Sequence, residues 1–281
     1  MRGNKVAATS NSKASVNYYD AHYGNFHSEL YSEIRHSAFG EDIGQSGWQT
    51  AAEQDQYLPA LSLASGKKLL DVCCGSGGPA LRIAHKSGCA LTGIDLHEAG
   101  ISVAHAMAAA RGMGEHCEFQ TANAAERLPF NDEEFDAITC IDAIIHLPDR
   151  PRVLAEWKRI LKPGGRMLFT DSTVVTGPLT KEEIAVRSSI GYFQFVPPDY
   201  DRQVLEQCGL KVLVCDDVTQ NMADLAAGLY TAREAQAKLL TQIEGESSHQ
   251  GQQTFLEVTS RIAQERRLSR FLYVAEKPAR I

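Results

Sequence analysis

Two aspartates and a run of glycines form the part of this sequence that is best suited to binding a small molecule. Asp71 lies near the end of an apolar run, and a turn containing Gly75, Gly77 and Gly78 follows it. Glycine permits backbone angles that a Cβ forbids, so such a turn lets the main chain approach a ligand closely. Asp95, at the end of a second apolar run, lies 20 residues beyond Gly75, a spacing at which a carboxylate can accept both hydroxyls of a ribose. The pattern predicts a site for a nucleotide-type cofactor.

Two classes of cofactor compete for this turn. The stretch Gly75–Ala80 satisfies the Gly-x-Gly-x-x-Ala pattern of dinucleotide-binding dehydrogenases. Asp71 would repel a pyrophosphate, however, whereas a carboxylate suits a cofactor that has a cationic amino-acid end and no phosphate. S-adenosylmethionine has this chemistry. The turn therefore favours S-adenosylmethionine, and a nicotinamide-dependent oxidoreductase stays as the alternative.

His146 is the candidate for a catalytic base. It follows the predicted fourth strand, and its ordinary pKa of about 6.5 suits proton acceptance near neutrality. Methyl transfer from a sulfonium needs a base only if the nucleophile arrives protonated. Asp142, four residues earlier, could orient the ring or attract a cationic substrate. A packing and hydrogen-bonding role for His146 is the alternative.

Asp71, Asp95 and His146 lie at or after apolar runs that alternate with helical segments. We therefore expect a sheet built from these runs to position them. This alternation predicts an α/β fold with a Rossmann-like, doubly wound, seven-stranded sheet, helices on both faces and a helical lid. The last strand is expected to be antiparallel. The predicted strands cover residues 69–73, 90–95, 117–121, 135–141, 166–172, 212–218 and 270–275.

The chain divides into a cofactor-binding core and additions to it. We expect a disordered lead-in at 1–15, an N-terminal helical flap at 16–63, a core at 64–173 and 201–281, and substrate-lid elements at 174–200 and 219–268. Because the lid elements follow strands whose carboxyl ends face the cofactor, they should close the site and select the substrate.

Composition argues against several classes of partner. The net charge is −7 and Lys/Arg-rich runs are absent, so we expect no nucleic-acid partner. No apolar run approaches the roughly 20 residues that span a bilayer, and the first residues lack the apolar segment of a signal peptide. We therefore expect a cytoplasmic monomer or homodimer without a membrane partner.

The cysteines predict reduced thiols rather than a metal site. There are seven, an odd number, and no Cys-x-x-Cys occurs. Cys73 and Cys74 are adjacent in a predicted strand, where neighbouring side chains point to opposite faces. We expect no bound metal.

Residues 67–171 resemble the class I S-adenosylmethionine-dependent methyltransferases, most closely in the turn Asp71-Val-Cys-Cys-Gly-Ser-Gly-Gly78. Within that superfamily, residues 40–47 and 142–147 resemble the sarcosine/dimethylglycine and phosphoethanolamine N-methyltransferases. Residues 128–130 and 161–165 resemble the ubiquinone/menaquinone-type enzymes. The resemblance implies a methyltransferase with S-adenosylmethionine as its cofactor.

The same resemblance implies a set of site residues. Asn123 stands where these enzymes usually place an aspartate that accepts the adenine amino group, and an amide oxygen can still accept that bond. For catalysis it implies His146, Asp142 and an N-terminal latch at Tyr19, with Tyr18 as the less favoured latch. The implied cofactor-binding residues are Asp71, Cys73, Gly75, Ser76, Gly77, Asp95, Leu96, Asn123, Ala124, Ile141, Gln45 and Trp48.

The methyl acceptor is expected to be a small metabolite, with an amine nitrogen as the leading prediction. A carbon or oxygen of an aromatic or quinone-like compound is the alternative, and a catalytically silent cofactor binder is a third. Residues 190–195 lack the cation that holds phosphate in the phosphoethanolamine enzymes, which argues against a phosphate headgroup. Arg187 or Arg261 could reach another anionic group.

Overall fold

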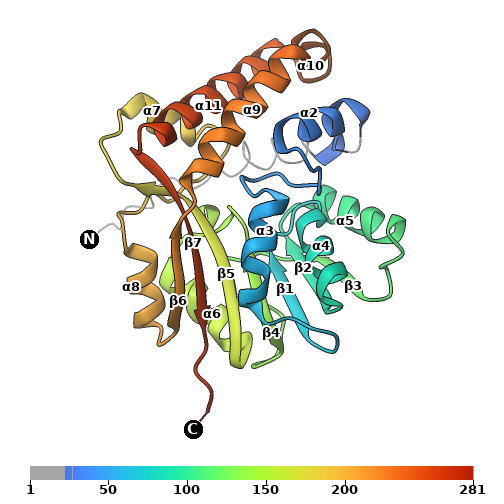
Figure 1. The fold of residues 1–281 in the computed structure, drawn as a ribbon, viewed down its shortest axis with the longest axis vertical. Helices are drawn as coiled ribbons and strands as arrows, with labels where there is room; N and C mark the ends of the chain where they lie inside the picture. Colours follow the sequence, from blue (N-terminus) through green and yellow to red (C-terminus); the bar gives the residue numbers. More distant parts are fainter. Residues whose placement is uncertain (1–22, 27, 281) are drawn as a thin grey trace, which may run out of the picture.

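Seven strands form one sheet in the order β3-β2-β1-β4-β5-β7-β6 in our computed structural model, which describes residues 23–26 and 28–280 (Figure 1). The predicted seven-stranded, doubly wound sheet is thereby confirmed. The strands are β1 (Lys68–Val72), β2 (Ala90–Asp95), β3 (Cys117–Thr121), β4 (Phe135–Cys140), β5 (Leu161–Val175), β6 (Lys211–Asp217) and β7 (Leu268–Glu276).

Strands β1 to β5 are parallel, and β7 runs antiparallel between β5 and β6. The order of the strands reverses between β1 and β4, because β1 pairs with β2 on one side and with β4 on the other. In sheets of this kind, ligands bind at such a switch point, outside the carboxyl ends of the strands. Asp71, Asp95, Asn123 and Asp142 all lie at or just beyond those ends.

Helices cover both faces of the sheet. One face packs against α3 (Ala51–Tyr57), the 3₁₀ helix η1 (Leu58–Leu61), α4 (Gly78–Ser87) and α5 (Glu98–Ala110). The opposite face packs against α6 (Arg150–Ile160) and α8 (Tyr200–Gln207). A short 3₁₀ helix, η2 (Ile144–His146), connects β4 toward α6. Between β3 and β4 the chain forms turns instead of a helix.

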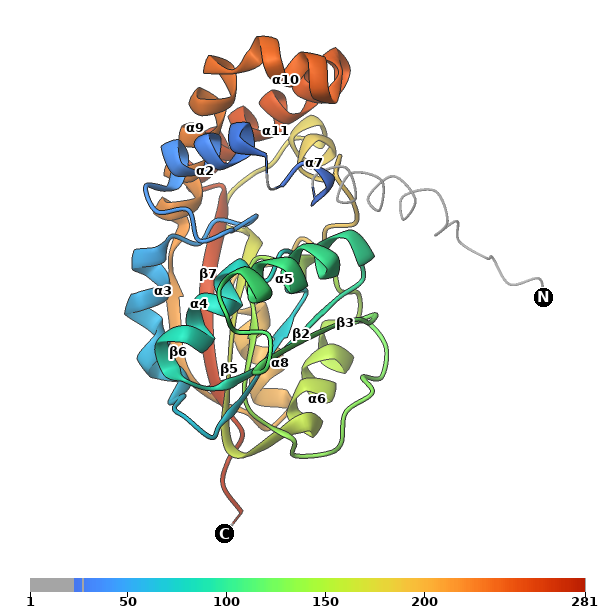
Figure 2. The ribbon, with the colours of Figure 1, turned by 90° about the vertical axis from the view of Figure 1, so that its right-hand side faces the viewer.

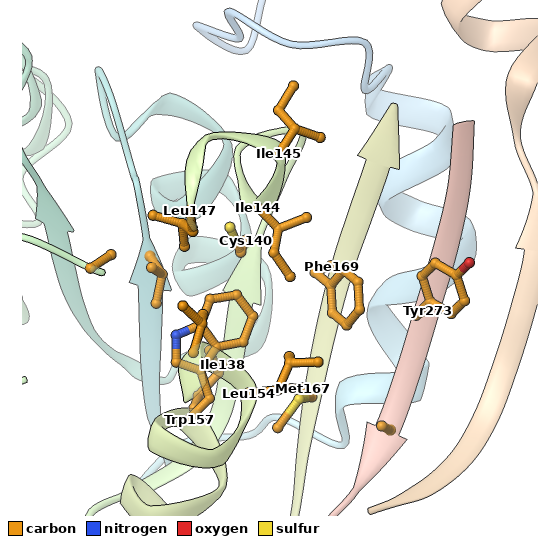
Figure 3. Close-up of a cluster of buried hydrophobic side chains, with 14 of the residues drawn as sticks. Ile138, Cys140, Ile144, Ile145, Leu147, Leu154, Trp157, Met167, Phe169 and Tyr273 are labelled. Carbon is orange, nitrogen blue, oxygen red and sulfur yellow. The ribbon is translucent and has the colours of Figure 1, made fainter. Parts of the chain in front are cut away.

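Trp157 is the largest fully buried side chain of the face that carries α6 (Figure 3). The indole packs edge-on against Phe169 of β5, with ring centroids 6.2 Å apart. Asp149 caps α6, as predicted, because its carboxylate accepts the Arg152 backbone N–H at 3.4 Å. This cap satisfies one of the backbone N–H groups that have no partner within the helix.

The remaining helices form a lid beyond the carboxyl ends of the parallel strands (Figure 2). They are α2 (Glu29–Phe39), α7 (Lys181–Arg187), α9 (Thr219–Ala235), α10 (Ala237–Glu244) and α11 (Glu246–Gln264). Tyr31 and Ile34 of α2 pack with Ala232 of α9 and Leu240 of α10. The lid is therefore built from three separate stretches of the chain.

Two differences from the prediction go beyond a shift of one or two residues at the end of a strand. The expected flap over residues 16–63 is divided, since α2 joins the lid whereas Tyr57 and Leu61 pack into the core of the sheet. Strand β5 begins at Leu161 rather than at Arg166, because Pro163-Gly-Gly165, which was expected to end the preceding helix, lies within the strand. Among the described helices, none is both long and apolar enough to cross a bilayer.

Trp157→Ala should lower the free energy of unfolding by about 3–5 kcal/mol, because a cavity would replace a fully buried ring. Trp157→Phe should lose less, since it keeps a ring and removes an indole N–H that has no acceptor among the described residues. Urea unfolding of both variants measures the difference. Arg152→Ala, on the exposed side of the same helix, serves as the control, and a loss for Trp157→Ala no larger than for this control would contradict the packing described.

Candidate active site

The turn after β1 has room for glycine alone at two positions. Gly75 and Gly77 have φ values of +53° and +74°, in the left-handed region. A Cβ on Gly75 would lie 2.4 Å from the Tyr23 hydroxyl, and one on Gly77 would lie 2.9 Å from the Phe119 ring. The turn is therefore glycine-specific, as the sequence predicted, and both glycines are buried, with Tyr23 lying against Gly75 and Phe119 against Gly77.

Asp95 binds this turn from the end of β2. Its two carboxylate oxygens accept the backbone N–H groups of Gly75 at 2.8 Å and His97 at 2.9 Å. Burial raises the pKa of Asp95, although these backbone bonds oppose the shift. Each oxygen keeps a second lone pair for a hydroxyl, and the neighbouring Leu96 side chain is 54% exposed. A carboxylate beside an exposed apolar side chain fits the ribose and adenine of the expected cofactor.

Asp71 lies nearly buried at the end of β1 and accepts the Thr139 hydroxyl at 2.6 Å. Burial raises the pKa of Asp71 to about 7, and the nearby Asp95 carboxylate raises it further while Thr139 opposes the shift. A cationic group next to Asp71 would favour the carboxylate form. This donor set fits the ammonium end of S-adenosylmethionine.

Cys73 adopts a left-handed conformation, with a φ of +59°, which is unusual for a residue with a Cβ. A hydrogen bond with Cys140, together with burial, raises the pKa of the Cys73 thiol well above its ordinary value. Cys73 is therefore a neutral thiol that contributes shape to the turn rather than a nucleophile.

The adenine end of the expected site is formed by the turn after β3. The Asn123 side-chain oxygen accepts the Ala125 N–H at 3.0 Å, and its amide donates to Glu126 at 3.1 Å. These bonds hold the amide in place, and its oxygen retains a second lone pair. Ala124 is buried on the face of the sheet that carries α6, and Ile141 packs on the face that carries α4 and α5.

Residues 40–48 belong to the loop between α2 of the lid and α3, and this loop contacts the glycine turn. The Ser76 hydroxyl donates to the Gly44 carbonyl at 2.6 Å, and a Cβ on Gly78 would lie 2.2 Å from the Ile43 carbonyl. Gln45 is buried and accepts the Ile43 N–H at 2.8 Å. Gln45 and Trp48, which the resemblance assigned to the cofactor, both line a cavity under the lid.

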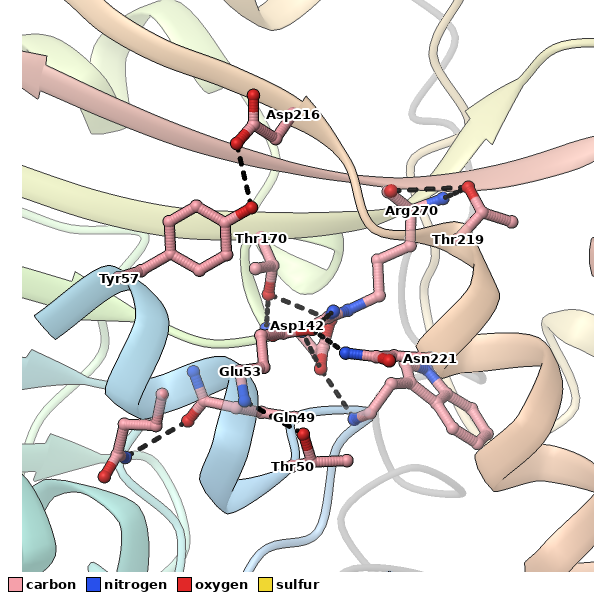
Figure 4. Close-up of polar contacts among 12 residues, drawn as sticks. Gln49, Thr50, Glu53, Tyr57, Asp142, Thr170, Asp216, Thr219, Asn221 and Arg270 are labelled. Carbon is pink, nitrogen blue, oxygen red and sulfur yellow. Dashed lines mark hydrogen bonds and ion pairs between the residues drawn. The ribbon is translucent and has the colours of Figure 1, made fainter.

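Asp142 forms the centre of a buried polar network (Figure 4). One of its oxygens accepts Arg270 Nε at 2.6 Å and the Thr170 hydroxyl at 2.9 Å, and the other accepts the Trp48 N–H at 2.7 Å. Arg270 also donates to both oxygens of Glu53, at 2.7 and 2.9 Å. Although burial lowers the pKa of Arg270, the two carboxylates hold it above its ordinary value.

Of the two roles suggested for Asp142, orienting the His146 ring is not supported, because Asp142 is turned toward Arg270 and no hydrogen bond joins Asp142 to His146 in the part of the chain that the structure describes. His146 Nδ1 instead lies 2.9 Å from the Tyr192 carbonyl. A carbonyl only accepts, so Nδ1 carries the proton and Nε2 carries the lone pair of the neutral ring. Burial lowers the pKa of His146 to about 4 and Arg187 lowers it further, although the Tyr192 carbonyl raises it. His146 is neutral at pH 7.

The cavity under the lid has a volume of about 140 Å³. Its walls are mostly apolar and come from both the core and the lid. Among the described residues that line it, Asp142 is the one carboxylate, and it is already engaged by Arg270. The principal wall residues are Ile34, Phe39, Trp48, Ile145, His146, Arg187, Ile190, Phe193, Leu229, Phe255 and Leu256.

The N-terminal latch predicted at Tyr19, or at Tyr18, lies outside the described residues. Tyr23, from the same aromatic stretch, is buried over Gly75, with its ring centroid 6.4 Å from that of His97. Sequence reasoning did not find Arg270 or Glu53, because nothing near them along the chain marks them as partners of Asp142.

Comparison with known proteins identifies the fold and its chemistry. Residues 70–169 match the family model described as "Methyltransferase domain". The chain is 31% identical over 206 residues to the 27-O-demethylrifamycin SV methyltransferase of Amycolatopsis mediterranei (strain S699), covering 72% of this chain and 75% of that protein. It is 31% identical over 184 residues to phosphoethanolamine N-methyltransferase 1 of Triticum aestivum, covering 64% of this chain and 35% of that protein.

A solved structure has the same fold. The phosphoethanolamine N-methyltransferase 2 of Haemonchus contortus, in complex with phosphomonomethylethanolamine and S-adenosylhomocysteine, superposes with a TM-score of 0.77. The match covers 93% of this chain and 60% of that chain at 18% identity. At this identity the likeness shows the fold alone.

Cofactor affinity should depend on pH through Asp71. Because the pKa of Asp71 is about 7 in the free protein, lowering the pH from 7.5 to 5.5 protonates it, and attraction for the cofactor's ammonium group is lost. The Kd for S-adenosylhomocysteine should rise by up to about tenfold per pH unit. Calorimetry across this range measures it. Asp71→Asn should bind more weakly with a flatter profile, and an unchanged slope in that variant would contradict the assignment.

Arg270→Met should lower the free energy of unfolding by about 3–5 kcal/mol, because it leaves Glu53 and Asp142 buried without their cation. The triple variant Glu53→Gln, Asp142→Asn, Arg270→Met removes all three charges and should recover part of the loss. Urea unfolding compares the two. If the triple variant is no more stable than Arg270→Met, uncompensated charge is not the cause.

Proposed function

Because this chain belongs to the family of S-adenosylmethionine-dependent methyltransferases, we propose that it methylates a hydroxyl oxygen of a small, mainly apolar molecule. S-adenosylmethionine is the methyl donor of this family. Its methyl group is bonded to a sulfonium and is therefore electrophilic, and the thioether that remains is the leaving group. The protein therefore has to hold the donor, align the acceptor oxygen and exclude water.

The core supplies the residues that hold the donor. In this proposal Asp71 binds its ammonium group, Asp95 accepts the ribose hydroxyls, and Asn123 accepts the adenine amino group. Leu96 and Ala124 contact the base, and the backbone of Gly75 and Gly77 approaches the amino-acid end. Cys73, Ser76, Ile141, Gln45 and Trp48 complete the walls around it.

The hydrogen bonds of Asp142 are the observation that favours oxygen over nitrogen as the methylated atom. An ammonium substrate needs an accessible carboxylate, yet both Asp142 oxygens are engaged by Arg270, Thr170 and the Trp48 backbone. The rest of the described wall is mostly apolar, and its three arginines include Arg35 and Arg233, which are paired with Asp42 and Glu244. An uncharged hydroxyl on an apolar molecule fits these walls.

His146 is the proposed base for this acceptor. The Tyr192 carbonyl holds the proton on Nδ1, so the lone pair of Nε2 can accept the hydroxyl proton as the O–C bond forms. Phe193 packs edge-on against the imidazole, with centroids 4.8 Å apart, and fixes the plane of the ring. Asp142 contributes indirectly, because it holds the Trp48 backbone at the edge of the cavity.

Methylation of an amine, the leading prediction from sequence, is the second candidate. The observation that favours it is the 31% identity to the wheat enzyme, whose name gives phosphoethanolamine as its substrate. An amine would have to enter as the free base, since the described wall residues offer it no accessible carboxylate. This candidate predicts activity that rises with pH as the ammonium group is deprotonated.

Two measurements test the proposal. Calorimetry should detect binding of S-adenosylmethionine and S-adenosylhomocysteine but no binding of NAD. A screen with labelled cofactor over phenols, alcohols and amines should then give oxygen methylation. Methylation of amines alone would overturn the choice of oxygen, and failure to bind either sulfur cofactor would overturn the whole proposal.

His146→Gln should lower kcat by about 10²-fold or more while leaving the affinity for S-adenosylhomocysteine unchanged. Wild-type kcat should stay level from pH 8 to pH 6, because the pKa of His146 is about 4 and the ring loses its lone pair only below that range. Steady-state kinetics provide both readouts. His116→Gln, at an exposed position, is the control, and an equal loss in cofactor affinity and kcat for His146→Gln would instead indicate a packing role.

A further inference from the structure

We propose that Thr173 is a positioning residue for the methyl transfer. Its hydroxyl tethers residues 192–196 to the end of β5, and this segment in turn keeps the Tyr192 carbonyl against Nδ1 of His146. The inference rests on the proposed function, in which His146 is the base. It adds to that function the side chain that fixes which nitrogen of the base carries the proton.

Residues 192–196 form an irregular segment that lies beside the end of β5. Up to Val196 they adopt neither helix nor strand, and Val196 makes a parallel bridge to Val174 of β5. Because β7 already pairs with Val174, this bridge uses the opposite edge of the strand. The Val175 N–H donates to the Val196 carbonyl at 2.8 Å, and the Val196 N–H donates to the Thr173 carbonyl at 3.2 Å. These bonds hold the carboxyl end of the segment.

The other end of the segment contacts the proposed base. The Tyr192 carbonyl lies 2.9 Å from His146 Nδ1, and Phe193 packs edge-on against the imidazole. The Gln194 N–H donates to the Ile145 carbonyl at 2.8 Å, so three consecutive residues contact η2. A shift of the segment would therefore move both the acceptor of the Nδ1 proton and the ring that lies against the imidazole.

The Thr173 side chain joins β5 to the middle of the segment. It is fully buried, and its hydroxyl lies 2.8 Å from the Gln194 carbonyl and 2.8 Å from Oδ1 of Asp171. Both of these oxygens are acceptors, so the hydroxyl shares its single proton between them in a three-centre bond. The same Oδ1 accepts the Thr173 N–H at 2.7 Å, which fixes the rotation of the side chain. The hydroxyl is thereby aimed at the Gln194 carbonyl.

Asp171 is itself held in place by a buried ion pair. Its other oxygen accepts Nη1 of Arg150 at 2.8 Å, and the same Nη1 donates to Asp201 near the start of α8. Arg150, Asp171 and Asp201 are all fully buried. Buried charges stay close to their partners, because separating them would leave each charge uncompensated. Thr173 is therefore fixed from the core of the sheet, and through it the core determines where the Tyr192 carbonyl lies.

Thr176, just beyond the end of β5, provides a matched control. Its hydroxyl donates to the Arg266 carbonyl at 2.8 Å and lies 2.8 Å from the Ser269 hydroxyl, on the side of β7. Among the described residues, it bonds no member of the segment 192–196. Replacing either threonine by valine removes a hydroxyl that donates to a carbonyl near the end of the same strand. A general loosening of this region would affect both variants alike, whereas the tether predicts an effect for Thr173 alone.

Exchange of the His146 Nδ1 proton with water tests the tether by NMR. Wild type, Thr173→Val, Thr173→Ser and Thr176→Val are labelled with ¹⁵N-histidine and saturated with S-adenosylhomocysteine at pH 7, and the His146 signal is identified by its loss in His146→Gln. Thr173→Val keeps the shape of the side chain without the hydroxyl. It should raise the exchange rate by about fivefold or more, as expected for the loss of one hydrogen bond. Thr173→Ser and Thr176→Val should stay within about twofold of wild type.

Turnover tests the consequence for catalysis. The acceptor is the phenol or alcohol that wild type methylates fastest in the screen with labelled cofactor. Thr173→Val should lower kcat by about tenfold or more, because the base is no longer aligned, and Thr173→Ser should recover most of this loss. The Kd for S-adenosylhomocysteine should be unchanged in both variants, since Thr173 lies outside the residues proposed to hold the donor.

The outcomes separate this inference from the proposed function. An unchanged exchange rate in Thr173→Val, an equal rise in Thr176→Val, or the lack of a protected His146 Nδ1 proton in wild type would overturn the inference. Faster exchange with an unchanged kcat would overturn it as well, since Thr173 would then hold the segment without serving the reaction. If wild type methylates no hydroxyl, the proposed function fails and the catalytic role of Thr173 fails with it, whereas the exchange rates still decide whether the tether exists.

Discussion

The buried arrangement of Arg270 between Glu53 and Asp142 is the interaction on which the active site depends. One guanidinium joins β7, α3 and the turn after β4, three parts of the chain that are far apart in sequence. Charges buried this completely are tolerated only when they are paired and hydrogen-bonded. Because Asp142 also holds the Trp48 backbone, the same network sets the position of the loop between the cofactor turn and the lid.

The two ends of the site are built by different means. The proposed donor end consists of backbone and carboxylates at the ends of neighbouring parallel strands, where the sheet itself determines the spacing. The proposed acceptor end consists mainly of aromatic and aliphatic side chains from α2, α7, α9, α11 and η2, which includes His146. A change in the lid can therefore alter the acceptor while the carboxylates at Asp71 and Asp95 keep their positions.

Local pattern predicted the strands and the glycine turn, but it predicted neither the Asp142 network nor the walls of the cavity. Strands β2 and β3 have the predicted bounds, because apolar runs and glycine turns are encoded within a few residues. The partner of Asp142 is 128 residues away along the chain, and no local signal distinguishes a buried Arg270 from a surface arginine. The same holds for the cavity walls, whose residues meet only after the lid has folded onto the core.

The order of the strands has a consequence for how the protein is made. Strand β7 comes after every other strand along the chain, yet it lies inside the sheet, between β5 and β6. During synthesis the ribosome releases Glu53 and Asp142 long before Arg270, so both acids stay hydrated, and the sheet stays open beside β5, until β7 emerges. Closing this gap requires contacts of large sequence separation, which form slowly. The active site is therefore assembled in the last stage of folding, and a nascent chain that lacks β7 exposes an unpaired strand edge that chaperones can recognise.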